Sequence, residues 1–335
     1  MTSGKGGYRE AGVDLASADD ALSRVKELVA STYTPGVLKG LGAFGGLFEL
    51  PQGMQRPVLV ASTDGVGTKT MVAARRRSYR GIGRDLVDHC INDILVQGAR
   101  PLFFLDYVAS SRLDPAITAE VVEGVAEACR ANGTALLGGE MAEMPGVYAA
   151  GELDVVGTIV GIVERSAVID GSTVRDGDVL LGLASGGLQT NGFSLARRVL
   201  DQALDEPFED GTVADALLAP HRSFLPALAP LLEVPGLVHA MAHITGGGLP
   251  GNLPRSLPEG LGAAIAPGSW PVPPIFELIQ QRGAIADEEM ARVFNLGVGF
   301  VVVVPPERVD EARALCPEPL FPIGRVEPGA GVRFR

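Results

Sequence analysis

The chain has 335 residues, of which 46% are hydrophobic and 20% charged, and this length and composition suit a globular protein of two domains. Its formal net charge is −12 at pH 7, which argues against a surface that binds nucleic acid. Three scattered cysteines are too few for a disulfide framework or a zinc site. Neither a leader-like segment nor a run of about 18 apolar residues is visible, so we expect a cytoplasmic protein without a membrane partner.

Predicted strands and helices alternate with glycine-rich turns through the first half of the chain. Helices are expected over 18–31 and 83–97. A third helix has clear ends, since Asp114 suits an N-cap and Asn132-Gly133 suits a stop. Apolar runs predict strands over 57–62, 102–108, 134–138 and 153–163.

The pattern changes to short turns between 165 and 177, so we divide the chain into an N-terminal domain, 1–168, and a C-terminal domain, 169–335. In the second half a helix is expected over 193–203, and strands are expected over 178–184, 260–266, 297–304 and 320–326. The strands are spaced too irregularly for repeated βαβ units. We therefore expect a fold of class α+β, built from two separate α/β domains.

Three short segments place acidic residues beside glycines or at the end of an apolar element. They are TDGVGTK at 63–69, Asn92-Asp93 and Gly138-Gly139-Glu140. Backbone N–H groups of a glycine loop can approach an anion closely, and Mg2+ takes carboxylate oxygens together with substrate phosphate. The combination predicts a site for a magnesium–nucleotide complex, although the sequence contains no Walker A loop.

Lysine is rare, with four lysines among 28 basic residues and none after Lys69. A chain that prefers arginine so strongly is expected to keep a lysine where a compact ammonium is needed. Lys69 lies in the glycine loop, so we interpret it as a phosphate-binding residue. Lys26, in the helix expected over 18–31, is either a ligand or a surface residue, and Lys5 and Lys39 are interpreted as surface residues.

Asp85, His89 and Asp93 are spaced four residues apart and share one face of the helix expected over 83–97. The remainder of this helix is apolar, which indicates a buried helix whose polar stripe needs partners or a ligand. A solvated outer face is the alternative. Asp93, beside Asn92 at the helix end, is the better metal candidate, and His89 could be an ordinary buried histidine.

Two glycine loops of the second half carry hydroxyls and amides but no carboxylate. They are SGGLQTNG at 185–192 and TGGG at 245–248. Such loops suit a neutral polar group or a phosphate monoester at a helix N-terminus. The sequence shows neither a nucleophile elbow around serine nor an activating context for a cysteine, so covalent catalysis by these residues is not expected.

Taken in this order, the motifs closely resemble the phosphoribosylformylglycinamidine cyclo-ligase family of purine biosynthesis. The likeness runs over nearly the whole chain, from YREAGVD at 8–14 through GLGAFGGLFELP at 40–51 to FNLGVGF at 294–300. LFFLDY at 102–107 and AEMPG at 142–146 look specific to this family. DGVGTK and GGE are shared with a wider superfamily of ATP users.

The resemblance implies ATP-dependent ring closure of formylglycinamidine ribonucleotide to aminoimidazole ribonucleotide, ADP and phosphate. ATP would phosphorylate the formyl amide oxygen, and an amidine nitrogen would then attack the carbon of this iminophosphate and expel phosphate. The resemblance also implies a homodimer in which two N-terminal sheets pair into a β-barrel, and a C-terminal sheet covered by helices. ATP and Mg2+ are the implied cofactors.

The same resemblance, carried over residue by residue, implies the site. The metal ligands would be Asp64, Asp93 and Glu140. Further contacts to the nucleotide would come from Lys26, Gly65, Gly67, Thr68, Lys69, Gly138 and Gly139. The ribonucleotide would lie against Thr190, Asn191, Gly192, Thr245, Gly246, Gly247 and Gly248. The candidate catalytic residues are Lys69, Gln189 and Asn191.

Gln189 departs from the family pattern, because many members carry a histidine just before the segment that corresponds to Thr190-Asn191-Gly192. A histidine could move protons at this position, whereas a glutamine can only form hydrogen bonds. The substitution therefore weakens any assignment of this position as an obligatory acid or base.

Other functions fit the sequence less well. Selenophosphate synthetase would need a nucleophilic cysteine near the N-terminus, and the hydrogenase-maturation carbamoyl dehydratase would end in a cysteine; this chain has neither. Thiamine monophosphate kinase is compatible with the superfamily motifs but not with AEMPG and LFFLDY. A regulator that binds ATP without turnover is the alternative from a different class.

Overall fold

The computed structural model describes residues 14–335, so most of the YREAGVD motif, together with Lys5, lies outside the described residues. The chain forms two compact units. Of the described residues, the first comprises 14–54, 61–90 and 101–161, and the second comprises 55–60, 91–100 and 162–335. The division falls inside several elements, so the helix that carries Asp85 and Asp93 contributes to both units.

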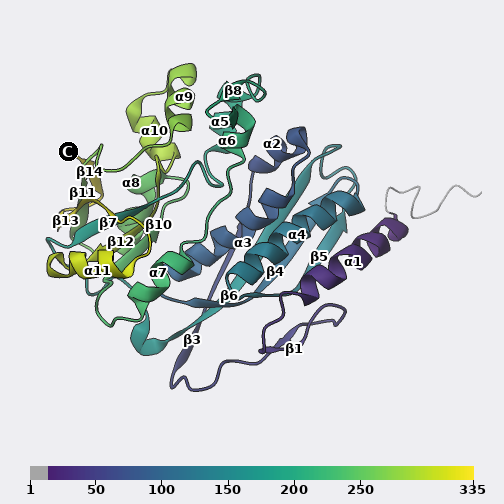
Figure 1. Cartoon of the computed structure of the whole chain (residues 1–335), viewed down its shortest axis with the longest axis horizontal. Coiled ribbons are helices and arrows are strands. Elements are labelled where there is room, and N and C mark those ends of the chain that lie inside the picture. The colour runs from purple at the N-terminus through teal and green to yellow at the C-terminus, as the bar shows by residue number, and fades with distance from the viewer. Residues whose placement is uncertain (1–13) are drawn as a thin grey trace, which may run out of the picture. The chain divides into compact units, whose positions relative to one another are not determined.

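The first unit combines a four-stranded sheet with helices. Its sheet has the order β3-β6-β4-β5, made by β3 (Pro57–Gly65), β6 (Leu153–Glu164), β4 (Arg100–Ser110) and β5 (Ala135–Glu143). Helices α1 (Leu15–Ala30) and α4 (Pro115–Ala131) pack against each other and against β5 (Figure 1). The remaining elements are β1 (Val37–Lys39), β2 (Leu47–Phe48), α2 (Lys69–Arg76) and α3 (Arg80–Leu95).

The second unit is built on a six-stranded sheet of order β10-β12-β7-β13-β11-β14, which is antiparallel except between β11 and β14. Its strands are β7 (Val179–Ala184), β10 (Ala240–His243), β11 (Leu261–Ile265), β12 (Val298–Val304), β13 (Phe321–Pro328) and β14 (Val332–Phe334). Its helices are α5 (Phe193–Leu200), α6 (Val213–Leu217), α7 (Leu225–Leu232), α8 (Gly248–Asn252), α9 (Pro274–Gly283), α10 (Asp287–Val293) and α11 (Val309–Leu315). Short pieces complete it: β8 (Pro207–Phe208), β9 (Gly211–Thr212), and the 3-10 turns η1 (Arg165–Ala167), η2 (Leu253–Ser256) and η3 (Pro306–Arg308).

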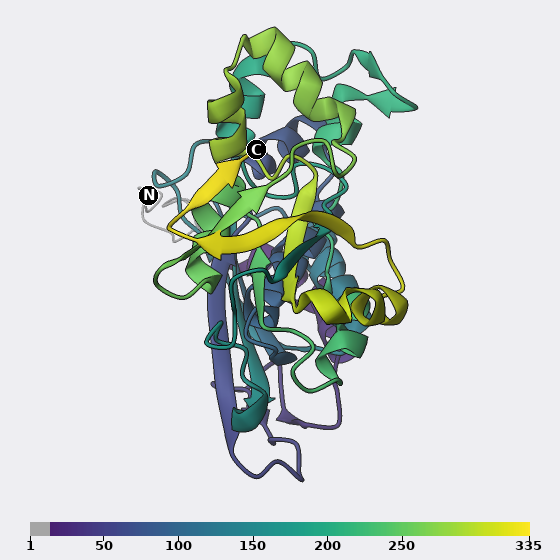
Figure 2. The same cartoon turned by 90° about the vertical axis from the view of Figure 1, so that its left-hand side faces the viewer.

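Both faces of the six-stranded sheet are covered, which explains the uninterrupted apolar run of β12. Phe300, Val302 and Val304 face a core that includes side chains of α7 and α11, whereas Val301 and Val303 face a second core that includes α8. In Figure 2, α11 leads into the long yellow strand β13, which runs across this unit. Alternate side chains of β12 are therefore buried on opposite faces of the sheet.

The predicted strands and helices are largely confirmed, and so are the ends of α4. Asp114 accepts hydrogen bonds from the N–H groups of Ala116 and Ile117, and Gly133 follows the helix with a φ of +63°. The fold class is also confirmed, since the chain combines two units of mixed helix and sheet.

The structure corrects one local expectation, adds one helix and decides between two alternatives. The Gly138-Gly139-Glu140 segment does not follow a strand but lies inside β5, where it pairs with β4. The helix α2, which begins at Lys69, was not predicted. The solvated outer face considered for α3 is also excluded, because Asp85 is 0% and His89 4% exposed. Of the helices described, none has the length and apolar character to cross a membrane.

Helices α3 and α4 approach each other closely at two glycines, which gives a test of their packing. A Cβ at Gly124 would lie 1.9 Å from the carbonyl oxygen of Arg80, and one at Gly83 would lie 2.0 Å from that of Val121. We expect Gly124→Ala to force the helices apart and to lower the free energy of unfolding by about 1–3 kcal/mol in urea denaturation. Gly81→Ala is the matched control, because nothing lies within 4 Å of its added Cβ. Equal losses in the two variants would contradict the close crossing.

Candidate functional site

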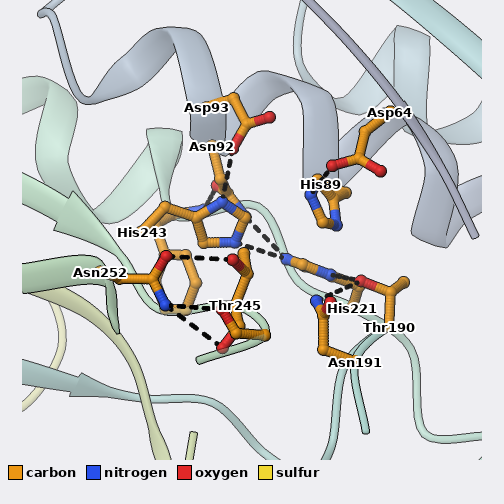
Figure 3. A network of polar contacts seen from close by, with 12 residues as sticks. Asp64, His89, Asn92, Asp93, Thr190, Asn191, His221, His243, Thr245 and Asn252 are labelled. Atoms are coloured by element: carbon orange, nitrogen blue, oxygen red, sulfur yellow. Dashed lines mark hydrogen bonds and ion pairs between the residues drawn. The ribbon is translucent and has the colours of Figure 1, made fainter. Parts of the chain in front are cut away.

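Asp64, at the end of β3, is held in a defined orientation within the first unit. Its Oδ2 lies 2.8 Å from Nε2 of His89, and its Oδ1 accepts a hydrogen bond of 2.6 Å from the N–H of Gly65. Figure 3 shows the imidazole of His89 directed at this carboxylate. The side chain of Asp64 is still 45% exposed, so its oxygens can be reached by a cation. The buried histidine that the sequence left undecided thus supports a candidate metal ligand.

The glycine loop after Asp64 turns the chain from β3 into α2. The N–H of Val66 bonds to the carbonyl of Val155, a Cβ at Gly65 would lie 3.2 Å from the same oxygen, and Gly67 has a φ of +62°. Gly67 is exposed, and Thr68 occupies the N-cap of α2 without a capping bond from its side chain. Backbone N–H groups at such a helix start favour an anion.

Lys69 is not presented at the surface of the first unit. Its ammonium lies 2.7 Å from Oδ2 of Asp85, and the two side chains are 1% and 0% exposed. Burial lowers the pKa of Lys69, and the neighbouring carboxylate of Asp85 partly offsets this effect. Contact with a phosphate would require this ion pair to open, so the phosphate-binding role of Lys69 stays a prediction. Lys26 is exposed on α1.

Gly139, the residue before Glu140, has a structural reason within the sheet. Gly139 pairs with Asp106 of β4, and a Cβ at Gly139 would lie 1.8 Å from Oδ1 of Asp106. Burial raises the pKa of Asp106 to about 7. Glu140, the next residue, is exposed, and its Oε1 accepts a bond from the N–H of Met141. Gly139 therefore makes room for the Asp106 carboxyl, and Glu140 stays available to a cation.

Asp88 of α3 offers a test of the electrostatics of this buried helix. Burial raises its pKa from 3.8 to about 7, although Arg84 and a hydrogen bond from Asn132 oppose the shift. The folded pKa lies above the unfolded one, so stability contributed by the neutral carboxyl is lost as the pH rises from about 4 toward 7. Asp88→Asn should therefore raise the melting temperature most above pH 7, with a gain that shrinks toward pH 4. A gain independent of pH would contradict this explanation.

In the second unit a chain of polar contacts joins the end of α3 to the glycine loops (Figure 3). Nδ1 of His243 lies 2.9 Å from Oδ1 of Asp93, and Nε2 of His243 lies 3.1 Å from Nε2 of His221. Nδ1 of His221 lies 3.1 Å from Oγ1 of Thr190. Asn92 also contacts Nε2 of His221, at 3.1 Å. The predicted acidic position, Asp93, and the predicted loop residue, Thr190, thus belong to one network.

The loop at 245–248 is held by a residue that the sequence did not single out. The side-chain amide of Asn252 donates to the carbonyls of Thr245, Gly246 and Gly248 at 3.3, 3.2 and 2.9 Å. Gly248, with a φ of +56°, could not carry a side chain, because a Cβ would lie 2.1 Å from the carbonyl oxygen of Ala291. The glycines here permit a tight turn into α8, in agreement with a backbone-lined anion site.

The two predicted loops lie side by side in this unit. A Cβ at Gly246 would lie 3.2 Å from Oδ1 of Asn191, which places the amide of Asn191 against the second loop. Gly192 has a φ of +79° and forms the N-cap of α5. Gln189 is different: it is 2% exposed, and a Cβ at Gly299 of β12 would lie 2.8 Å from its Nε2. Gln189 therefore packs against β12, and its catalytic role stays a prediction.

Sequence reasoning missed His221, His243 and Asn252. His221 is 129 residues from Asn92 and 22 residues from His243, so no spacing within a helix or strand predicts either contact. The one available signal was scarcity, because the chain contains only four histidines and two of them are these. His243 also lies two residues before the predicted loop at 245–248.

Comparisons with known proteins cover both units. The family model described as AIR synthase related protein, N-terminal domain, matches residues 49–163, and the corresponding C-terminal domain model matches residues 175–335. A phosphoribosylformylglycinamidine cyclo-ligase from Methylobacillus flagellatus is 48% identical over 97% of this chain and 95% of its own length. One from Burkholderia mallei is 50% identical over 91% of this chain and 88% of its own length.

Solved structures with low sequence identity share the fold. The thiamine-monophosphate kinase from Stenotrophomonas maltophilia has a TM-score of 0.68 at 19% identity and covers 94% of this chain and 95% of its own. The hydrogenase maturation protein HypE in complex with ATP has a TM-score of 0.67 at 19% identity, over 97% of this chain and 88% of its own. At this identity the likeness supports the fold alone.

Proposed function

The chain belongs to the phosphoribosylformylglycinamidine cyclo-ligase family, and we propose that it closes the imidazole ring of formylglycinamidine ribonucleotide at the expense of ATP. The observation that carries this proposal is an identity of 48% that extends over 97% of the chain. The contacts that join Asp93 to Thr190 support it, because they connect a candidate metal ligand with a loop suited to a phosphate ester.

In the proposed reaction the formyl amide oxygen attacks the γ-phosphorus of ATP, which gives ADP and an iminophosphate. An amidine nitrogen then forms a bond to the formyl carbon, and the bond from carbon to the phosphate oxygen breaks. The attacking nitrogen loses one proton, and phosphate leaves with the former formyl oxygen. Such a reaction needs reactants held in place and charge neutralised more than it needs a covalent catalyst.

The donor set suits Mg2+, which prefers hard carboxylate oxygens. The carboxylate of Asp64 is fixed in orientation yet 45% exposed, and Glu140 is exposed. We propose that Asp64, Asp93 and Glu140 hold the ion. A bound Mg2+ would neutralise the charge of the transferred phosphoryl group. Backbone groups of 65–68, together with Gly138 and Gly139, would orient the ATP phosphates, and Lys26 and Lys69 remain candidates for the same task.

The ribonucleotide would occupy the loops of the second unit. Asn191, which stands between Thr190 and Gly192 in the first loop, lies beside Gly246, and Asn252 fixes the carbonyls of the second loop. The N–H groups and hydroxyls of these loops suit the oxygen atoms of a sugar phosphate. We propose that Asn191 would hydrogen-bond the reacting part of the ribonucleotide and that Gln189, packed against β12, would restrict the movement of the loop.

We propose a homodimer and a cytoplasmic location as well. Large apolar side chains are exposed on two strands of the four-stranded sheet, with Leu59 of β3 at 56% and Leu105 of β4 at 38%. A sheet that exposes such residues is expected to be covered by a partner. A second copy of the chain, its sheet paired with this one into a barrel, would cover them.

The activity itself is directly testable. Purified protein with ATP, Mg2+ and formylglycinamidine ribonucleotide should release ADP, phosphate and aminoimidazole ribonucleotide in equal amounts. Aminoimidazole ribonucleotide is measured after conversion to a coloured derivative, and ADP is measured in a coupled enzyme assay. Release of ADP without the imidazole, or release only in the presence of thiamine monophosphate, would overturn the proposal in favour of a kinase.

A further inference from the structure

A small pocket lies at one edge of the six-stranded sheet of the second unit. Its volume is about 250 Å3, and it is lined by the turn after α3, by the linker at 169–171, by β10 and by η2. β10 is the first strand in the order of this sheet, so one of its edges has no neighbouring strand. None of the lining residues belongs to the loops at 185–192 and 245–248, so the pocket is distinct from the candidate ribonucleotide site.

Hydrogen bonds and close packing join the segments that line this pocket. The N–H of Ile169 donates to the carbonyl of Gln97 at 3.2 Å, which ties the linker to the turn after α3. Oγ of Ser256 donates to the carbonyl of Met241 at 2.6 Å, which ties η2 to β10. Gly171 has a φ of +80°, and a Cβ there would lie 2.4 Å from the carbonyl oxygen of Ser256. The pocket is therefore a fixed feature of this unit.

Two side chains of opposite charge, Asp170 and Arg255, line the pocket. Within residues 14–335 Arg255 forms no ion pair, and its guanidinium donates one long hydrogen bond of 3.4 Å from Nη1 to Oδ1 of Asn252. Because an arginine has five N–H donors, most of those of Arg255 are available to a ligand. The carboxylate of Asp170 accepts a bond of 2.9 Å from the N–H of Ser172. Hydrogen bonds from Ser172 lower the pKa of Asp170, so this carboxylate is charged at neutral pH.

The two charges select for a ligand that carries both signs. A guanidinium matches the geometry of a carboxylate, and a carboxylate attracts an ammonium group. An anion alone would also meet the charge of Asp170, and a cation alone would meet that of Arg255. Val96 and Ile169, both half-buried, add an apolar wall. The pocket is smaller than the range of about 300–1,000 Å3 for drug-sized ligands, so a small α-amino acid with an apolar side chain fits it best.

Arg255 connects this pocket with the loop at 245–248 through Asn252. Oδ1 of Asn252 accepts the bond from Arg255 and a second bond of 3.2 Å from Oγ1 of Thr245, the latter visible in Figure 3. The side-chain amide of Asn252 fixes the carbonyls of the loop. A ligand carboxylate would compete with Asn252 for the guanidinium. Its binding would therefore remove one of the contacts that hold Asn252 in place.

We propose that this pocket is a second ligand site, which binds a small apolar α-amino acid with its carboxylate at Arg255 and its ammonium at Asp170, and that binding there loosens the loop at 245–248. The site itself goes beyond the proposed function. Its effect on the loop rests on that function, because the loop is the proposed place of the ribonucleotide.

Binding is measured by NMR on the full chain with isotope-labelled δ1 methyl groups of isoleucine. L-Valine is the probe, and the methyl group of Ile169 is the reporter, identified by the loss of its signal in Ile169→Val. We expect this resonance to shift with a Kd on the order of 1 mM. Ile279 of α9, which is buried and does not line the pocket, should not respond. Isovalerate, which lacks the ammonium, and isobutylamine, which lacks the carboxylate, should bind at least about tenfold more weakly.

Two substitutions test the assigned contacts. Arg255→Gln and Asp170→Asn each remove one charge and should weaken binding of L-valine by at least about tenfold, the loss of one charge-assisted hydrogen bond. Arg313→Gln on α11 is the matched control and should bind L-valine as the wild type does, because Arg313 is also exposed but does not line the pocket. Equal binding of L-valine and isovalerate, or normal binding by Arg255→Gln, would overturn the assignment of the site.

The effect on the loop is measured as coupling between the two ligands. L-Valine should raise the Kd and the KM for formylglycinamidine ribonucleotide about two- to fivefold, the contribution of one weak hydrogen bond, and leave the KM for ATP unchanged. Because coupling is reciprocal, saturating ribonucleotide should raise the Kd of L-valine by the same factor. Asp170→Asn should keep the KM of the wild type and lose the response to L-valine. Arg255→Gln should show the raised KM without L-valine, since its contact with Asn252 is lost.

The possible outcomes separate the two proposals. If the wild type binds no ribonucleotide, the proposed function fails, whereas the resonance of Ile169 still decides whether the pocket binds L-valine. If the ribonucleotide binds and L-valine leaves Ile169 unshifted, the pocket is not an amino-acid site and this inference is wrong. If both ligands bind without any effect on each other, the connection to the loop through Asn252 is wrong and the second site stands alone.

Discussion

Replacing Asp64 by asparagine should lower kcat by at least about a hundredfold, because a neutral amide binds Mg2+ weakly and leaves the charge of the triphosphate unscreened. The structure predicts only a small loss of stability. Among the contacts of Asp64, Oδ1 accepts a bond from Gly65 N–H and Oδ2 faces His89, and asparagine has one acceptor oxygen instead of two. The loss of one such bond costs about 1 kcal/mol.

The measurement combines turnover with binding of Mn2+, a spectroscopic substitute for Mg2+, followed by electron paramagnetic resonance. Asp64→Asn should bind Mn2+ more weakly, and higher concentrations of Mg2+ should restore part of its turnover. Asp19→Asn, which removes an exposed carboxylate on α1, is the control and should change neither. An Asp64→Asn variant with normal turnover and normal Mn2+ affinity would show that this carboxylate holds no metal.

Lys69→Met should destabilise the protein strongly, by about 3–5 kcal/mol in the free energy of unfolding, because it removes the cation that faces a buried carboxylate. The ammonium of Lys69 and Oδ2 of Asp85 are 2.7 Å apart, with side chains 1% and 0% exposed. Replacing both residues, as Lys69→Met with Asp85→Leu, should recover most of this stability, since apolar pairs often substitute for a buried ion pair. Urea denaturation of the single and double variants measures the difference.

The double variant also tests the phosphate-binding role predicted for Lys69. With stability recovered, any remaining loss of turnover belongs to the chemistry and not to unfolding. A stable double variant that has lost turnover supports a role for Lys69 at the phosphate. A stable double variant with normal turnover would mean that Lys69 acts only by holding α2 to α3, and the nucleotide would then be bound by the loop backbone and the metal.

The sequence by itself determined the elements and the order of the motifs, because these depend on neighbours in the chain. Asp114 and Gly133 predict the two ends of α4. The apolar run of β12 predicts a strand, and the structure shows that this strand is buried on both faces. The same local patterns failed at Gly139. There a glycine pair was expected at the end of a strand, although it lies inside β5. Gly139 is a glycine because the carboxyl of Asp106 occupies the space that a side chain would need.

Only the tertiary structure decided which polar residues meet. Asp93 and His243 are 150 residues apart, and Asn92 and His221 are 129 residues apart, so their contacts arise when distant segments pack. Lys69 and Asp85 lie on successive helices, and their burial depends on how α2 and α3 pack within the first unit. Spacing along a chain specifies which side chains share a face. The free energy of burying charged and polar groups then specifies which remote partners those faces must find.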